Sequence, residues 1–202
     1  MKKFLITILL TLCTLPALAE NTILIVGDSL SAGYGIDPSQ GWVQLLQQRL
    51  QNLKYKYHVV NASITGDTTS NGLQRLPAAL KQYQPQITII ELGGNDALRG
   101  LPTPLIKNNL QKIIALTEAA NSKVMLLGVR IPPNYGEAYT GQFQQIYQDF
   151  SQQTDLVVVP LFLTGIDTDH AKMQADGIHP LASAQPVMLE NVWGTLQKLL
   201  HY

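Results

Sequence analysis

A serine directly after a short apolar segment is the first candidate for chemistry in this sequence. Ser29 lies in the segment Gly27-Asp28-Ser29-Leu30, which follows the apolar residues 23–26. A serine on the turn that leaves a β-strand presents its hydroxyl at the strand end, where neighbouring backbone N–H groups can stabilise a developing oxyanion. The same residues also suit an ordinary turn. Ser29 is therefore a candidate nucleophile whose assignment depends on partners elsewhere in the chain.

An aspartate and a histidine three residues apart supply candidate partners near the end of the chain. Asp176 and His179 lie in the segment Asp-Gly-Ile-His-Pro at residues 176–180. Side chains with this spacing can share one face of a turn, so the carboxylate could orient the imidazole to accept a serine proton. An Asp-x-x-His pair is weak evidence when it stands alone. It gains weight from the candidate nucleophile at Ser29.

Two further segments that follow apolar runs contain glycine and offer hydrogen-bond donors. The segment Gly-Gly-Asn-Asp at residues 93–96 lets the backbone approach a ligand closely, and the Asn95 amide can donate an N–H. Residues 61–67 include Gly66, whose backbone N–H is another candidate donor. Both segments also suit ordinary loops. Their occurrence at equivalent strand ends favours one shared site.

The glycines after the first apolar run also allow a phosphate-binding interpretation. Gly27, Gly33 and Gly35 follow a predicted strand, as glycines of nucleotide-binding loops do. The patterns G-x-x-x-x-G-K and G-x-G-x-x-G are both missing, and Asp28 would repel a phosphate. The sequence therefore disfavours a nucleotide site here.

The elements that must position these residues follow a regular alternation of strand and helix patterns. Apolar runs of strand length alternate with longer segments of helical spacing, which is typical of βαβ units and predicts an α/β fold with a parallel sheet. Such sheets bind ligands at the carboxyl ends of their strands, where the candidate residues lie. Pro186 fits only in the first turn of the last helix. We expect strands at 23–26, 57–60, 86–92, 124–129 and 157–162, and helices at 42–50, 69–83, 104–120, 139–153 and up to about residue 200.

The amino terminus predicts export. Residues 1–19 combine Lys2 and Lys3, a short apolar run and an A-x-A signal that ends at Ala19, so we expect a signal peptide cleaved after Ala19 and no stable membrane anchor. Residues 20–202 have the size of one domain. The mature protein would be periplasmic or secreted.

The composition of the expected mature chain excludes several classes of site. Its 12 basic and 14 acidic side chains form no basic stripe, which argues against a nucleic-acid partner. Cys13, the single cysteine, lies in the leader, so disulfides, thiolate metal sites and a cysteine nucleophile are not expected. Near Asp176 and His179, only His170 could add a metal ligand. These residues therefore give no indication of a metal site.

Taken in order, four segments resemble the SGNH, or GDSL, hydrolase family. They hold Ser29 in the GDSL block, Gly66, Asn95 in the GGND block, and Asp176 with His179 in the D-x-x-H block. The similarity extends over most of the mature chain and is most specific for a bacterial periplasmic thioesterase and lysophospholipase subfamily. The longest matching runs are residues 27–34, 60–68, 91–96 and 133–136.

The resemblance implies a flavodoxin-like three-layer α/β/α fold with a five-stranded parallel sheet, and no cofactor. It implies that Ser29 attacks an acyl ester or thioester, while His179 serves as base and later as acid. Asp176 would hold His179. The N–H groups of Ser29 and Gly66 and the Asn95 side chain would stabilise the tetrahedral intermediate.

The substrate is less closely defined by the sequence. Two prolines and a glycine in residues 131–136 predict an ordered loop, and the resemblance implies that Ile131 and Pro132 contact the acyl chain. The leading hypothesis is a monomeric enzyme that hydrolyses fatty acyl thioesters, lysophospholipids or aryl esters. A carbohydrate O-acetyl esterase is the second hypothesis, and a non-catalytic acyl-lipid or sugar carrier is the third.

Overall fold

Five apolar segments form one sheet in the computed structural model, which describes residues 21–153 and 156–201. All neighbouring strands are parallel, in the order β2-β1-β3-β4-β5. This is the flavodoxin-like order, and it confirms the expected fold class. The strands are β1 (Asn21–Gly27), β2 (Tyr57–Asn61), β3 (Ile87–Glu91), β4 (Lys123–Leu127) and β5 (Val157–Val159).

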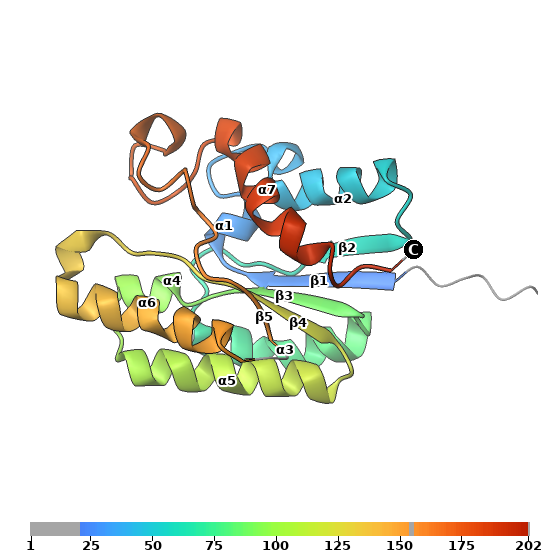
Figure 1. Ribbon diagram of the computed structural model, residues 1–202, viewed down its shortest axis with the longest axis horizontal. Coiled ribbons are helices and arrows are strands. Elements are labelled where there is room, and N and C mark those ends of the chain that lie inside the picture. Colours follow the sequence, from blue (N-terminus) through green and yellow to red (C-terminus); the bar gives the residue numbers. More distant parts are fainter. Residues whose placement is uncertain (1–20, 154–155, 202) are drawn as a thin grey trace, which may run out of the picture.

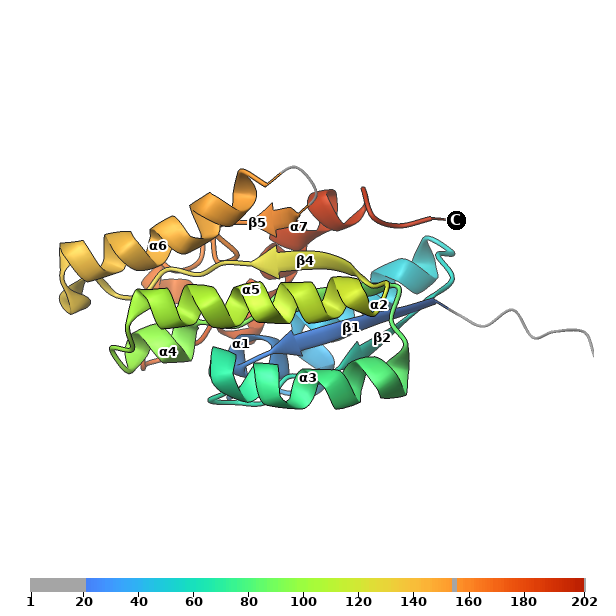
Figure 2. The same ribbon diagram turned by 90° about the horizontal axis from the view of Figure 1, so that it is seen from below.

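Helices cover both faces of this sheet, which gives three layers (Figure 1). One face carries α1, α2 and α7, and the other carries α3, α5 and α6; Figure 2 shows α5 running along the sheet between α3 and α6. Pro186 lies in the first turn of α7, as expected. The helices are α1 (Ser29–Ala32), α2 (Trp42–Asn52), α3 (Thr69–Tyr83), α4 (Gly94–Leu98), α5 (Thr103–Ala119), α6 (Glu137–Ser151) and α7 (Gln185–Leu196).

The central strands β1 and β3 are buried along most of their length because helices lie on both sides. Residues 23–26 of β1 and 87–91 of β3 are buried, and a parallel sheet covered on both faces is expected to have such continuous apolar runs. The polar residues in these two runs are Thr88 and, at the end of β3, Glu91, which is the ionisable one. Its burial has consequences for the active site.

The fifth strand is shorter than the sequence suggested. We expected a strand at 157–162, but β5 ends at Val159. Pro160 has no N–H to donate to the ladder, and the chain instead returns to β4 through a hydrogen bond from Phe162 N to the Gly128 carbonyl, 2.7 Å long. Residues 93–96, which also suit an ordinary loop, lie at the start of α4. The expected loop at 131–136 contains a 3₁₀ turn at Pro133–Tyr135.

The strand order creates a crevice where the direction of chain progression reverses. From β1 the chain passes to β2 on one side of the sheet and then to β3 on the other, so the carboxyl ends of β1 and β3 form the topological switch point. Ser29 follows β1, and Asn95 follows β3. In the described parts of the chain, no helix is long and apolar enough to span a membrane. Residues 1–19, where a signal peptide is expected, lie outside the described residues.

Candidate active site

Ser29 occupies the first position of α1, immediately after β1. The Asp28 carboxylate accepts a hydrogen bond from the backbone N–H of Leu30 over 3.0 Å, which caps this short helix. Ser29 is largely buried, yet it borders a cavity of about 780 Å³. The turn therefore presents the serine hydroxyl to an internal space large enough for a small-molecule substrate.

The structure brings Ser29, His179 and Asp176 into one chain of hydrogen bonds. His179 Nε2 lies 2.9 Å from Ser29 Oγ, and His179 Nδ1 lies 2.6 Å from Asp176 Oδ2. With Nδ1 protonated, Nε2 is the acceptor for the serine proton. This is the arrangement in which a carboxylate orients an imidazole and the imidazole activates a hydroxyl.

The local turn keeps Asp176 ionised. Its Oδ1 atom accepts backbone N–H groups from Ile178 and His179, at 2.9 and 3.0 Å. Desolvation opposes ionisation, but the hydrogen bonds from the His179 ring and from these two N–H groups outweigh it and lower the pKa of Asp176 from 3.8 to about 2. The carboxylate is thus available to stabilise an imidazolium at any ordinary working pH.

Tyr34 contacts the His179 ring, and Gln174 links the segments that carry these two residues. The rings of Tyr34 and His179 have centroids 4.5 Å apart and planes tilted by 42°. Gln174 Nε2 donates hydrogen bonds to the carbonyl oxygens of Tyr34, at 2.8 Å, and Pro180, at 3.1 Å. These contacts join the segment that carries His179 to the loop after α1. Sequence reasoning gave neither side chain a role.

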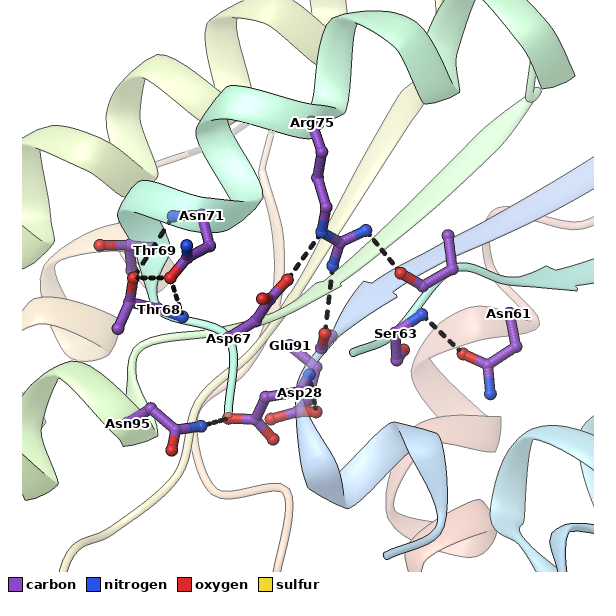
Figure 3. A network of polar contacts seen from close by, with 12 residues as sticks. Asp28, Asn61, Ser63, Asp67, Thr68, Thr69, Asn71, Arg75, Glu91 and Asn95 are labelled. Carbon is purple, nitrogen blue, oxygen red and sulfur yellow. Dashed lines mark hydrogen bonds and ion pairs between the residues drawn. The ribbon is translucent and has the colours of Figure 1, made fainter. Parts of the chain in front are cut away.

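Asn95 lies in α4 and borders the same cavity as Ser29. Its Nδ2 atom donates a hydrogen bond to Asp28 Oδ2 over 2.9 Å (Figure 3). An amide nitrogen carries two hydrogens, so a second N–H is left for a ligand. Asp28 therefore fixes the orientation of the candidate oxyanion donor.

Gly66 lies in the loop after β2, with a φ of +83° that favours glycine. The loop is attached to the end of β1, because Ile64 N donates to the Gly27 carbonyl over 3.1 Å. Arg99 Nη2 donates to the Gly66 carbonyl over 3.0 Å. Gly66 itself is not among the described residues that border the cavity.

A pair of buried carboxyl groups lies beneath the nucleophile. Glu91 Oε2 accepts the Asp28 backbone N–H at 3.3 Å and the Ser31 hydroxyl at 2.8 Å. Burial, and then the charge of Asp28, raise the pKa of Glu91 well above 4.5. Burial also raises the pKa of Asp28 to about 6, against the lowering effect of its hydrogen bonds from Leu30 and Asn95. Burial thus favours the protonated form of Glu91, a feature that sequence reasoning missed.

The cavity beside Ser29 has mostly apolar walls. Ile131 and Pro132, the residues expected to contact substrate, both border it. Arg130 and Asp167 also border it and form a two-bond ion pair, with both N···O distances 2.8 Å. The other apolar residues of the wall include Leu98, Val129, Leu163, Met173 and Ile178.

His170 borders the cavity, but it is His179 that contacts Ser29. Within residues 21–153 and 156–201, no group of three or more His, Cys, Asp or Glu side chains could hold a metal ion.

Comparisons with known proteins identify relatives that are named as esterases and thioesterases. The chain is 50% identical over 182 residues to esterase TesA of Pseudomonas aeruginosa, covering 90% of each protein. It is 42% identical over 193 residues to the Escherichia coli K12 protein thioesterase 1/protease 1/lysophospholipase L1, covering 96% of this chain and 91% of that one.

A solved structure extends the similarity to three dimensions. The psychrotrophic esterase EstA from Pseudoalteromonas sp., inhibited by monoethylphosphonate, matches with a TM-score of 0.78 and 40% identity, covering 88% of this chain and 97% of that chain. The profile of the GDSL-like lipase/acylhydrolase family matches residues 25–185. The chain belongs to the GDSL-like lipase/acylhydrolase family.

Proposed function

We propose that the protein is a serine esterase and thioesterase that forms an acyl-enzyme on Ser29. The observation that carries this proposal is the continuous hydrogen-bonded chain from Asp176 through His179 to Ser29 at the wall of a largely apolar cavity. Nucleophilic catalysis requires a weak nucleophile beside a base, with a third group that orients the base. These three side chains supply each part.

In the acylation step, Ser29 Oγ attacks the substrate carbonyl carbon while His179 Nε2 takes the hydroxyl proton. Asp176 stabilises the imidazolium that forms. The tetrahedral intermediate then expels the alcohol or thiol, which receives the proton from His179. The acyl group remains on Ser29 as an ester.

In the deacylation step, a water molecule replaces the leaving group. His179 takes one proton from the water, the hydroxide attacks the acyl carbonyl, and Ser29 leaves with the proton returned by His179. The carboxylic acid is released and the enzyme returns to its starting state.

The negative charge of both intermediates needs fixed donors. We assign this role to the backbone N–H groups of Ser29 and Gly66 and to the free N–H of the Asn95 amide. The hydrogen bond from Asn95 to Asp28 supports this role, because a donor that is already oriented loses no freedom when the charge develops.

The apolar cavity favours substrates with a medium or long acyl chain over substrates that carry only an acetyl group. We place the acyl chain of the substrate against Ile131 and Pro132. The candidate substrates are fatty acyl thioesters, lysophospholipids and aryl esters. The test is to measure kcat/KM for acetyl to palmitoyl esters of one leaving group. A maximum at medium or long chains is expected. A maximum at acetyl would favour a carbohydrate O-acetyl esterase, and a lack of turnover would favour an acyl carrier.

Export and assembly complete the proposal. We infer that residues 1–19 are a cleaved signal peptide, that residues 20–202 form a single hydrolase domain, and that the mature protein acts as a monomer in the periplasm or outside the cell. The sequence pattern at Ala17-Leu18-Ala19 supports the cleavage position. Amino-terminal sequencing of the exported protein should begin at Glu20, and retention of Met1 would contradict the proposal.

A further inference from the structure

Arg75 uses all three nitrogens of its guanidinium group to join separate parts of the site. It projects from α3, and its side chain is only 22% exposed. Its Nε atom donates to Asp67 Oδ2 over 2.7 Å, Nη1 donates to the Ala62 carbonyl, and Nη2 donates to the Gly27 carbonyl over 3.3 Å. Figure 3 shows the Arg75 side chain reaching from the helix toward Asp67.

The partners of Arg75 belong to the two segments that carry backbone oxyanion donors in the proposed mechanism. Gly27 ends β1, two residues before Ser29. Ala62 follows β2 directly, and Asp67 is the neighbour of Gly66. The guanidinium therefore holds the Gly66 loop at both of its ends and fastens it to the strand that leads to the nucleophile.

The helix that carries Arg75 is itself fixed to the third donor segment. At the start of α3, Thr69 donates its backbone N–H to Asp96 Oδ2 at 2.8 Å and its hydroxyl to Asp96 Oδ1 at 2.6 Å. Asp96 follows Asn95 in the chain. The segments that carry Ser29, Gly66 and Asn95 are thus linked through one helix.

We propose that Arg75 is a positioning residue that fixes the backbone oxyanion donors by fastening the Gly66 loop to the end of β1. This inference rests on the proposed function. All three guanidinium nitrogens of Arg75 donate to protein oxygens, so it acts through the loop and not by contact with substrate. A donor that matters mainly in the transition state affects kcat more than KM.

Arginine is the residue type that this position requires. A planar guanidinium presents donors in fixed directions, whereas a lysine ammonium is a point charge on a flexible stem. Lysine at position 75 would keep the charge beside Asp67 but could not hold both carbonyl oxygens in the same geometry. Arg75→Lys is therefore expected to lower kcat although it conserves the positive charge.

The experiment compares Arg75→Lys and Arg75→Ala with wild type and with Arg49→Ala. Arg49 is a matched control, because its side chain is 27% exposed and pairs with Glu190 away from the cavity. Active sites are counted with an organophosphonate, and thermal melts report folding. We expect kcat per active site to fall by about 10- to 100-fold in both Arg75 variants, with a much smaller change in KM. Arg49→Ala should retain wild-type kcat.

The outcomes separate the two proposals. Wild-type kcat per active site in both Arg75 variants would overturn the positioning role of Arg75. A rise in KM as large as the fall in kcat would overturn it as well. If Arg75→Ala does not fold, Arg75→Lys and Asp67→Asn provide the same test, with a loss of kcat expected in each. A wild-type protein that neither hydrolyses esters nor reacts at Ser29 would overturn the proposed function instead.

Discussion

The Nε2 atom of His179 lies 2.9 Å from Ser29 Oγ, although the two residues are 150 positions apart in the chain. The fold makes this contact, because Ser29 leaves β1 and His179 precedes α7 at the same edge of the sheet. Tyr34 and Asp176 then fix the imidazole from two directions. The base is therefore assembled by long-range packing and oriented by a local turn.

The first prediction concerns which histidine is the base. His179→Ala should lower kcat by about 10⁴-fold or more, because the serine loses its proton acceptor. His170→Ala, the matched control at the cavity wall, should retain most of the turnover. Steady-state kinetics on folded protein checks both variants. The reverse pattern would transfer the role of base to His170.

A second prediction concerns Asn95 as an oxyanion donor. Asn95→Ala should lower kcat by about 10² to 10³, with little change in KM or melting temperature. Asn95→Asp should be at least as harmful, because it places a carboxylate where negative charge develops and beside the carboxylate of Asp28. Kinetics with titrated active sites, together with a thermal melt, distinguishes the roles. If Asn95 only shapes its turn, the alanine variant will lose stability and keep its kcat.

The third prediction concerns the pH dependence of stability caused by Glu91. Its pKa is raised by burial and by Asp28, so between pH 4.5 and the raised value the folded protein holds a proton that the unfolded chain has released. The free energy of unfolding contributed by this group therefore decreases as the pH rises, by up to about 1.4 kcal/mol per pH unit. Because glutamine does not titrate, the free energy of unfolding of Glu91→Gln lacks this decrease.

Denaturant unfolding at a series of pH values from pH 5 upward tests that prediction. The difference in free energy of unfolding should shift steadily in favour of Glu91→Gln as the pH rises. Glu190→Gln is the control, because the hydrogen bond from Arg49 lowers the pKa of Glu190, in the opposite direction to the shift of Glu91. A constant difference for Glu91→Gln would mean that Glu91 is ionised throughout.

The fourth prediction concerns Gly93, the N-cap residue that precedes α4, with a φ of +118°. An added Cβ atom would lie 2.4 Å from the hydroxyl oxygen of Tyr147, which is buried and hydrogen-bonded to the Leu92 carbonyl. Gly93→Ala should lower the free energy of unfolding by at least about 2 kcal/mol, because backbone strain and overpacking each cost about 1–3 kcal/mol. Gly100→Ala, with a φ of +66° and no neighbour within 4 Å, should cost less. Equal losses in the two variants would remove the steric argument.

Local sequence patterns were sufficient to predict the parallel sheet and to select the residues that the structure brings together. Ser29 and Asn95 could be identified because each follows an apolar strand, and chain order placed both at one edge of the sheet. Pro160 ends β5, but the apolar residues that follow it in the sequence favoured a longer strand. Loss of a backbone donor outweighed that apolar pattern.

The supporting polar groups could not be predicted from the sequence. Glu91 ends an apolar strand and gives no local sign that its carboxyl group is buried beneath the Ser29 turn. Arg75 has the spacing of an ordinary helix residue, and its partners are contributed by β1 and by the loop after β2. Such contacts depend on tertiary packing. Helical or strand periodicity does not encode them.

The most direct measurement is the stoichiometry of phosphonate labelling combined with the activity of Ser29→Ala. We expect an organophosphonate to modify one residue per molecule, Ser29, with loss of ester hydrolysis in proportion to labelling. Mass spectrometry of the digested protein identifies the modified residue. Ser29→Ala should remain folded, resist labelling and lose turnover by about 10⁴-fold or more. Labelling at another residue, or full hydrolytic activity in Ser29→Ala, would contradict the assignment of Ser29 as the nucleophile.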